Sequence, residues 1–114
     1  MQSLNTFVGL DMTLARQLGR AGEAAVGIVG PKLRIPIPGT SRTRVPDQLT
    51  ATILVEVKNV QALTFTQQLR DFSSYARATG RTFELYVRAD TRLSGPLQEA
   101  VARGDIILRE IPGS

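Results

Sequence analysis

The sequence contains neither cysteine nor histidine, and these two absences exclude several kinds of functional site. Without cysteine the chain has no disulfides and no thiolate metal ligands. Without histidine it has no His-based zinc site, no Ser-His catalytic pair and no imidazole base. Any catalysis must therefore use carboxylates, amines, guanidinium groups, hydroxyls or amides, with a hard cation as the natural metal partner.

Long apolar runs are also absent, because no stretch approaches the roughly 20 residues that a membrane span requires. The beginning of the chain lacks the pattern of a signal peptide, so we expect any export to depend on a larger carrier protein. Phosphate-binding glycine loops and the nucleophile-elbow motif are missing as well.

The composition fits one compact domain with a hydrophobic core. The chain has 114 residues, of which 42% are hydrophobic and 21% charged. Its net charge is +4, and twelve of the fourteen basic residues are arginines, the others being Lys32 and Lys58. Arginine binds phosphate through two parallel hydrogen bonds, which makes nucleic acid a plausible partner. A charge of this size is also ordinary for a soluble domain.

The pattern of apolar residues predicts a mixed α/β fold in the order helix, three-strand meander, helix, strand, helix, strand. We expect residues 1–10 to be an unpatterned lead-in and residues 11–114 to form a single domain. The predicted helices start at Asp11, at a capping box of Thr64 and Gln67, and at Ser94, and end before Gly30, at Gly80 and at Arg103. The predicted strands are 33–37, 42–47, 53–60, 82–87 and 106–111, with 48–52 as a connection.

Helical spacing also predicts which side chains enter the core. In the first helix the predicted apolar stripe contains Leu14, Leu18, Ala21, Ala25 and Ile28. Glu23 lies roughly opposite this stripe beside Arg16 and Arg20, which favours a solvated surface carboxylate. In the second helix the stripe contains Phe65, Leu69, Phe72 and Ala76. Gln68 and Tyr75 border one edge of that stripe, and Arg70 and Arg77 border the other.

The main candidates for catalytic and metal-binding residues are Asp47, Glu56 and Lys58. Alternation along the strand 53–60 puts Glu56 and Lys58 on one face within a Val/Ile run, where an unpaired charge is costly. A turn centred near Ala51 and Thr52 would place Asp47 opposite Glu56. Two carboxylates there could hold a divalent metal, with the Val57 carbonyl as a further oxygen ligand. The alternative is a half-exposed strand with a Glu/Lys pair on its wet face.

Four segments carry a resemblance to a known family: Arg44-Val-Pro-Asp47, Val55-Glu-Val-Lys-Asn59, Thr66-Gln-Gln-Leu-Arg-Asp71 and Val87-Arg-Ala-Asp-Thr91. Together they resemble the PD-(D/E)XK restriction-endonuclease-like superfamily. More closely, residues from about Gly19 to Ile111, about four-fifths of the chain, resemble the seventh restriction-endonuclease-type family of bacterial polymorphic toxin domains.

The resemblance implies a role for each residue of the constellation. Asp47 and Glu56 would be ligands of Mg²⁺ or Mn²⁺, and Lys58 would be the catalytic amine. The family also implies an acidic residue on the first helix, for which Glu23 is the candidate, and a polar residue bordering the site, for which Gln68 is the candidate. A further expectation concerns phosphate contacts, for which the candidates are Arg42, Arg44, Arg70 and Arg77.

These expectations combine into a Mg²⁺-dependent endonuclease that cleaves DNA. By resemblance it would be the C-terminal toxin domain of a secreted bacterial effector used in interbacterial competition. It would act in the cytoplasm of the target cell and be inhibited by a cognate immunity protein. Two alternatives remain open: an RNase or tRNase toxin on the same fold, and a module of this fold that binds nucleic acid without cleaving it.

Overall fold

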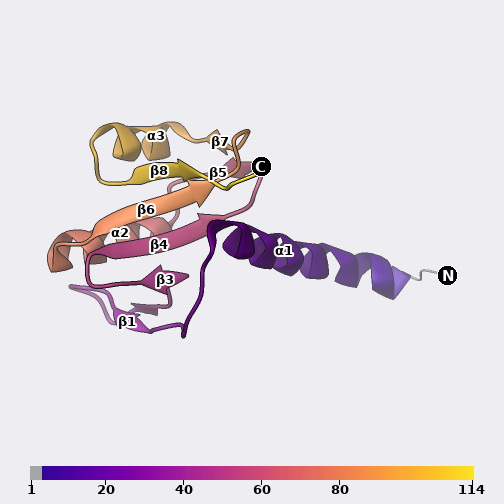
Figure 1. Cartoon of the computed structure of the whole chain (residues 1–114), viewed down its shortest axis with the longest axis horizontal. Helices are drawn as coiled ribbons and strands as arrows, with labels where there is room; N and C mark the ends of the chain where they lie inside the picture. Colours follow the sequence, from indigo (N-terminus) through magenta and orange to yellow (C-terminus); the bar gives the residue numbers. More distant parts are fainter. Residues whose placement is uncertain (1–3) are drawn as a thin grey trace.

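A four-stranded mixed sheet lies at the centre of the molecule, with helices on both of its faces (Figure 1). The computed structural model describes the backbone of residues 4–114 and the side chains of residues 13–114. The helices are α1 (Leu4–Val26), α2 (Gln67–Thr79) and α3 (Gly95–Ala102). The strands are β1 (Ile35–Pro36), β2 (Thr43–Arg44), β3 (Gln48–Leu49), β4 (Ile53–Lys58), β5 (Ala62–Leu63), β6 (Thr82–Val87), β7 (Arg92–Leu93) and β8 (Ile107–Glu110). The α/β class and the mixed sheet predicted from the sequence are confirmed.

Strand β4 lies inside this sheet, between β3 and β6, and it is buried on both faces, with Val55 and Val57 on one and Leu54 and Glu56 on the other. The strand order is β3-β4-β6-β8, in which β3 runs antiparallel to β4 while β6 and β8 run parallel to it. Parallel strands are normally covered on both faces, and the four residues 54–57 are all buried. The strand with the clearest sequence pattern therefore contributes side chains to the apolar cluster on each face of the sheet.

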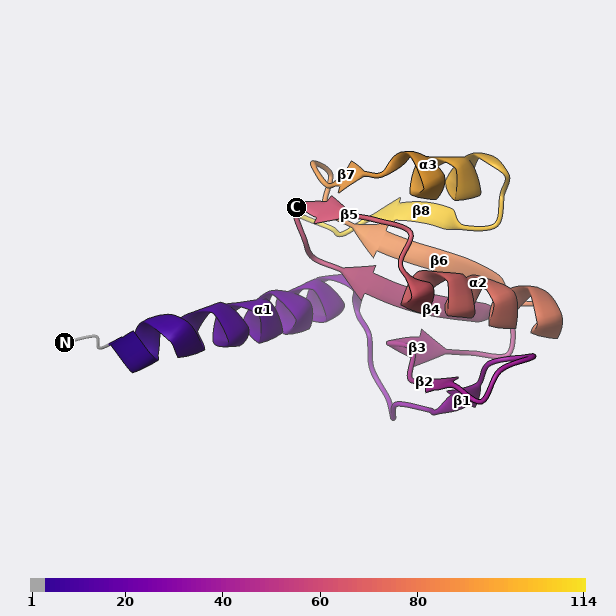
Figure 2. The same cartoon turned by 180° about the vertical axis from the view of Figure 1, so that it is seen from behind.

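Two clusters of apolar side chains occupy the two faces of the sheet. Figure 2 shows α2 in front of β4 and β6 on one face, where Leu54, Leu69, Phe72 and Leu85 form the main core together with α3. On the other face a smaller cluster contains Val55, Val57 and Ile111, with Val26 of α1 packed against it. Glu56 and Lys58 alternate with Val55 and Val57, so they point toward α2.

The predicted second and third helices and the strand between them are confirmed, with one change at a helix cap. The Thr66 hydroxyl, rather than that of Thr64, caps α2 by accepting a hydrogen bond from the Leu69 backbone N–H at 3.2 Å. The helix ends at Gly80, whose φ of 71° is the left-handed conformation that glycine adopts readily. Helix α3 begins where predicted, with Ser94 as its N-cap, and β6 has the predicted bounds.

The first helix differs from the prediction in both its start and its packed face. It begins at Leu4, so it includes residues 4–10 of the expected lead-in, whereas residues 1–3 lie outside the described part. Asp11 therefore lies inside the helix instead of capping it. Leu14 of the predicted apolar stripe is 46% exposed, whereas Gly22 is buried. The stripe was wrong because the helix approaches β4 through a glycine, which carries no hydrophobic signal.

The segment before β4 is more divided than the predicted meander. Strands β1 and β2 form a small hairpin of their own, and the expected strand 42–47 ends at Arg44. Pro46 has no N–H to donate to a ladder, and it separates β2 from β3. Strand β3 falls within the expected connection 48–52. The short pair β5 and β7 lies outside the predicted elements.

Helix α1 extends away from the sheet at the end where β4 and β6 terminate (Figure 1). It contacts the domain through its C-terminal part, near β4. Over residues 4–114, no helix combines the length and the apolar character that a membrane crossing requires.

Candidate active site

The hairpin of β3 and β4 brings Asp47 and Glu56 together. Its register pairs Gln48 with Val55 and Leu49 with Leu54, so the next position along the ladder sets Asp47 opposite Glu56. The Asp47 backbone N–H donates to Oε1 of Glu56 at 3.2 Å. The predicted turn at residues 51 and 52 and the opposition of these two residues are therefore confirmed.

The Asp47 carboxylate is fixed by the backbone of the neighbouring strand. Its Oδ2 accepts a hydrogen bond from the Val57 N–H at 2.8 Å, where a continuing strand would offer a carbonyl oxygen. In an extended strand the N–H and C=O of one residue point to the same edge, so the Val57 carbonyl also faces the edge at which Asp47 lies. Three oxygen donors, from two side chains and one backbone group, are thus available at this edge.

Glu56 is a carboxyl buried among apolar side chains, with 4% of its surface exposed. Burial, followed by the negative charge of Asp47, raises the pKa of Glu56 to about 8, although the nearby Lys58 ammonium opposes this shift. At neutral pH a proton therefore competes for this carboxyl. A divalent cation beside it would instead favour the ionised form, because metal binding releases protons from its ligands.

Lys58 is positioned by contacts with two side chains. Its Nζ donates to Oε1 of Gln68 on α2 at 2.6 Å and lies 3.3 Å from Oε2 of Glu56. The Lys58 side chain is three-quarters buried, so its ammonium is held in place rather than moving freely in solvent. Gln68 borders the apolar stripe of α2, as predicted, and here it accepts the hydrogen bond that orients this amine.

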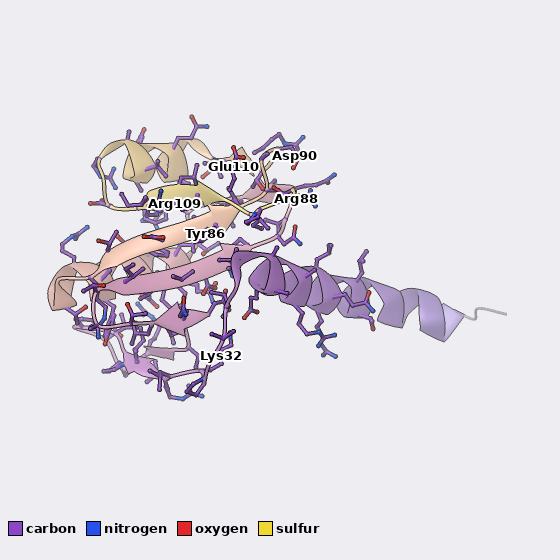
Figure 3. All side chains as sticks on the ribbon, viewed as in Figure 1. Lys32, Tyr86, Arg88, Asp90, Arg109 and Glu110 are labelled. Carbon is purple, nitrogen blue, oxygen red and sulfur yellow. The ribbon has the colours of Figure 1, made fainter. Side chains whose placement is uncertain are left out.

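Glu23 is connected to Asp47 by Lys32, a residue that the sequence analysis did not single out. Lys32, on the segment between α1 and β1, donates to Oε1 of Glu23 at 2.5 Å. The same Nζ donates to the Asp47 carbonyl at 3.0 Å and lies 3.5 Å from the Asp47 carboxylate. Figure 3 labels Lys32 on the segment between α1 and β1, apart from the labelled residues Tyr86 of β6 and Arg109 of β8. Glu23 is half-buried and paired with Lys32, so the interpretation of a solvated carboxylate beside Arg16 and Arg20 was wrong.

The arginines expected to contact phosphate have partners within the chain. Arg42 donates through two nitrogens to the buried carboxylate of Asp71, at 2.9 and 2.8 Å, and Arg44 donates to it at 2.9 Å. The hydrogen bond from Arg42 is the main reason that the pKa of Asp71 lies far below its usual range. Arg70 donates to the Phe65 carbonyl at 3.0 Å, and Arg77 lies 3.4 Å from Asp105. Phosphate contact by these arginines stays a prediction.

The oxygen donors at this edge fit a hard divalent cation in their chemistry. Mg²⁺ and Mn²⁺ prefer carboxylate and carbonyl oxygens, and Mg²⁺ is often bound through only one or two carboxylates. Asp47 and Glu56 would supply the carboxylates, with the Val57 carbonyl as an additional ligand. Among the described residues, no three acidic side chains are already grouped to hold a metal. Glu23 therefore stays a predicted ligand, separated from Asp47 by the Lys32 ammonium.

Comparison with protein families identifies the group to which this chain is related. The model of the family "restriction endonuclease fold toxin 7" matches residues 19–97, more than two-thirds of the chain. The matched range includes Glu23, Asp47, Glu56, Lys58 and Gln68. No curated protein and no solved structure shows significant similarity to the chain. The chain therefore belongs to the restriction endonuclease fold toxin 7 family, and with it to the nuclease-type toxins.

Proposed function

We propose that this domain is a metal-dependent endonuclease that hydrolyses phosphodiester bonds in DNA. The observation that supports the proposal best is the buried Glu56, which is hydrogen-bonded to the Asp47 backbone and paired with a Lys58 amine that Gln68 holds. A carboxylate pair and an oriented amine are costly to build into an apolar strand for stability alone. Membership of a family of nuclease-fold toxins supports the same conclusion.

Each residue contributes one physical effect to hydrolysis. Asp47 and Glu56 would hold a Mg²⁺ or Mn²⁺ ion through carboxylate oxygens. When bound, the ion would activate water and neutralise the charge on the phosphate oxygens. Lys58, held 2.6 Å from Gln68, orients the attacking water or stabilises the negative charge that grows as the new P–O bond forms and the leaving oxygen departs.

The biological setting is part of the proposal. We infer that the domain is the C-terminal toxin of a secreted effector and that it acts in the cytoplasm of a competing cell. An immunity protein that covers the site around Asp47 and Lys58 would protect the producer. The positive net charge and the excess of arginine suit a polyanionic substrate.

The test is digestion of plasmid DNA and of total RNA with Mg²⁺, with Mn²⁺ and with chelator, comparing the parent with Asp47→Ala. We expect nicked and linear plasmid with either metal, none with chelator, and a loss of at least about a hundredfold in rate for the variant. Thermal melting of both proteins in chelator checks that the variant is folded.

The other outcomes separate the alternatives. Degradation of RNA with intact plasmid would assign the same site to an RNase or tRNase. Tight DNA binding with no cleavage of either substrate, and no heat of Mn²⁺ binding in calorimetry, would indicate a binding module instead. Cleavage that persists unchanged in Asp47→Ala would refute the site described above.

A further inference from the structure

The Lys32 ammonium lies between Asp47, a ligand in the proposed metal site, and Glu23, which stays a predicted ligand. We propose that Lys32 is a resident counter-cation of this site, which holds Glu23 and Asp47 together in the absence of metal and which the divalent ion displaces. The inference depends on the proposed function, because it concerns the same metal site. It assigns a positioning role to a residue outside the four segments that carry the resemblance.

One nitrogen atom makes all the contacts that this role requires. Lys32 Nζ lies 2.5 Å from the Glu23 carboxylate and 3.5 Å from the Asp47 carboxylate, and it donates to the Asp47 carbonyl at 3.0 Å. Two carboxylates are therefore within reach of a single cation at this point. Because Asp47 also accepts the Val57 N–H and lies against Glu56, the lysine borders the place where metal ligands gather.

Lys32 is always positively charged at neutral pH, but its ion pairs with Glu23 and Asp47 are exposed enough to be broken. A lysine amine is protonated at neutral pH, so Nζ carries a positive charge between the two carboxylates. The Lys32 side chain is 44% exposed, and Gly30 and Pro31 precede it on a loop. A long, exposed side chain with one positive charge can leave at low cost when a doubly charged ion arrives.

A purely structural role for Lys32 predicts the opposite response to mutation. If the lysine only braces the ligands, its removal should weaken metal binding, because the carboxylates would lose their support. If the lysine competes with the metal for the same oxygens, its removal should strengthen metal binding. It should also weaken the metal-free fold, since Glu23 and Asp47 then repel each other without compensation.

The experiment measures Mn²⁺ affinity by calorimetry and thermal stability in chelator for the parent and for Lys32→Met. We expect Lys32→Met to bind Mn²⁺ about threefold to tenfold more tightly, as suits the loss of two partly exposed ion pairs. Its melting temperature in chelator should fall below that of the parent. Added Mn²⁺ should raise that temperature more in the variant than in the parent.

Two control variants isolate the position of the charge. Arg34→Met removes one positive charge two residues away, where the side chain donates to the Thr43 hydroxyl and not to the acidic residues, so Mn²⁺ affinity should stay at the parent value. Lys32→Arg keeps the charge and should bind Mn²⁺ with an affinity close to that of the parent.

The failures of the two proposals are distinguishable. If the parent binds Mn²⁺ and Asp47→Ala does not, the metal site stands, and an unchanged or weaker affinity in Lys32→Met then overturns only the role of Lys32. If the parent itself shows no Mn²⁺ binding that depends on Asp47, the metal site of the proposed function fails, and the role of Lys32 fails with it.

Discussion

Glu56 is a carboxyl that the proposed chemistry needs at a buried position where folding would favour an apolar side chain. It occupies the middle of β4, where the neighbouring positions are buried apolar residues, and its carboxyl has a pKa of about 8 because of this burial. An apolar residue at that position would suit the sheet better. The polar cluster around Glu56 therefore lowers the stability of the sheet, and such a loss of stability is typical of functional sites.

Lys58 provides the most direct test at the residue scale. Replacement by Met keeps the aliphatic stem but removes the ammonium near Glu56 and Gln68. We expect the DNA cleavage rate to fall by about a hundredfold or more, the usual range for loss of a positioned acid–base or electrostatic group. The measurement is plasmid nicking at saturating Mn²⁺, with thermal melting as a check on folding.

Arg103→Met is the matched control for Lys58→Met, because it removes one positive charge at the end of α3, where Arg103 contacts only Asp105 among the ion pairs of the described residues. Its nicking rate should match the parent. A Lys58→Met protein that cleaves as fast as this control would remove Lys58 from the mechanism.

At the scale of elements, the contact between α1 and β4 places Glu23 beside the sheet. A Cβ at Gly22 would lie 3.0 Å from Cγ1 of Val57 and 3.2 Å from Cβ of Asn59, closer than ordinary van der Waals contact. The Asn59 side chain donates to the Leu18 carbonyl at 2.7 Å, which joins the helix to the end of the strand. This close approach of α1 to β4 requires glycine at position 22. It also places the next residue, Glu23, near Lys32.

Gly22, which lies against β4, and Gly19, which does not, should therefore respond to alanine with opposite signs. Gly22→Ala should destabilise the domain by about 1 kcal/mol, because crowding against β4 outweighs the gain in helix propensity. Gly19→Ala meets no atom within 4 Å and should stabilise the domain by about 0.5–1 kcal/mol. Urea unfolding measures both changes, and equal stabilisation by both substitutions would show that α1 does not pack closely on β4.

For the molecule as a whole, the pair of arginines on Asp71 joins the small hairpin to the main core. Arg42 and Arg44 come from the hairpin of β1 and β2, whereas Asp71 belongs to α2, and Gln67 donates to the same carboxylate at 3.0 Å. The hairpin continues directly into Pro46 and Asp47. The buried carboxylate of Asp71 thus fixes the segment that delivers Asp47 to the site.

Asp71 also contributes to how stability depends on pH in the acidic range. Because its pKa is lower in the folded than in the unfolded chain, its contribution is complete above the unfolded value of about 4 and is lost as the pH falls below it. Asp71→Asn should cost on the order of 3 kcal/mol near pH 7, since two guanidinium groups lose their anion. The difference from the parent should shrink as the pH falls below about 4.

Denaturant unfolding of both proteins from pH 3 to pH 7 measures this dependence. Asp105→Asn serves as the control, because Asp105 is more exposed and lies near Arg77 and Arg103 at the molecular surface, so a much smaller change is expected. A difference between Asp71→Asn and the parent that is constant across this range would contradict the assigned ionisation.

The sequence alone determined the parts of this protein that depend on local pattern. The β-branched run of β4, the Ser94 cap of α3 and the alternation in β6 predict their elements because each follows from neighbouring residues. The register that sets Asp47 against Glu56 was predicted on the condition that the turn is centred near Ala51 and Thr52, because the turn of a short hairpin fixes its pairing. The motif residues and the family could be recognised for the same reason.

Only the tertiary structure decided the rest. The face of α1 that packs on β4 depends on how closely Gly22 can approach Val57. The sequence of the helix does not indicate that Val57 is its neighbour. Lys32 reaches Glu23 and Asp47 through a loop, and Asp71 gathers Arg42 and Arg44 across 27 to 29 residues. Contacts between distant segments depend on the relative placement of whole elements, and local periodicity cannot encode it.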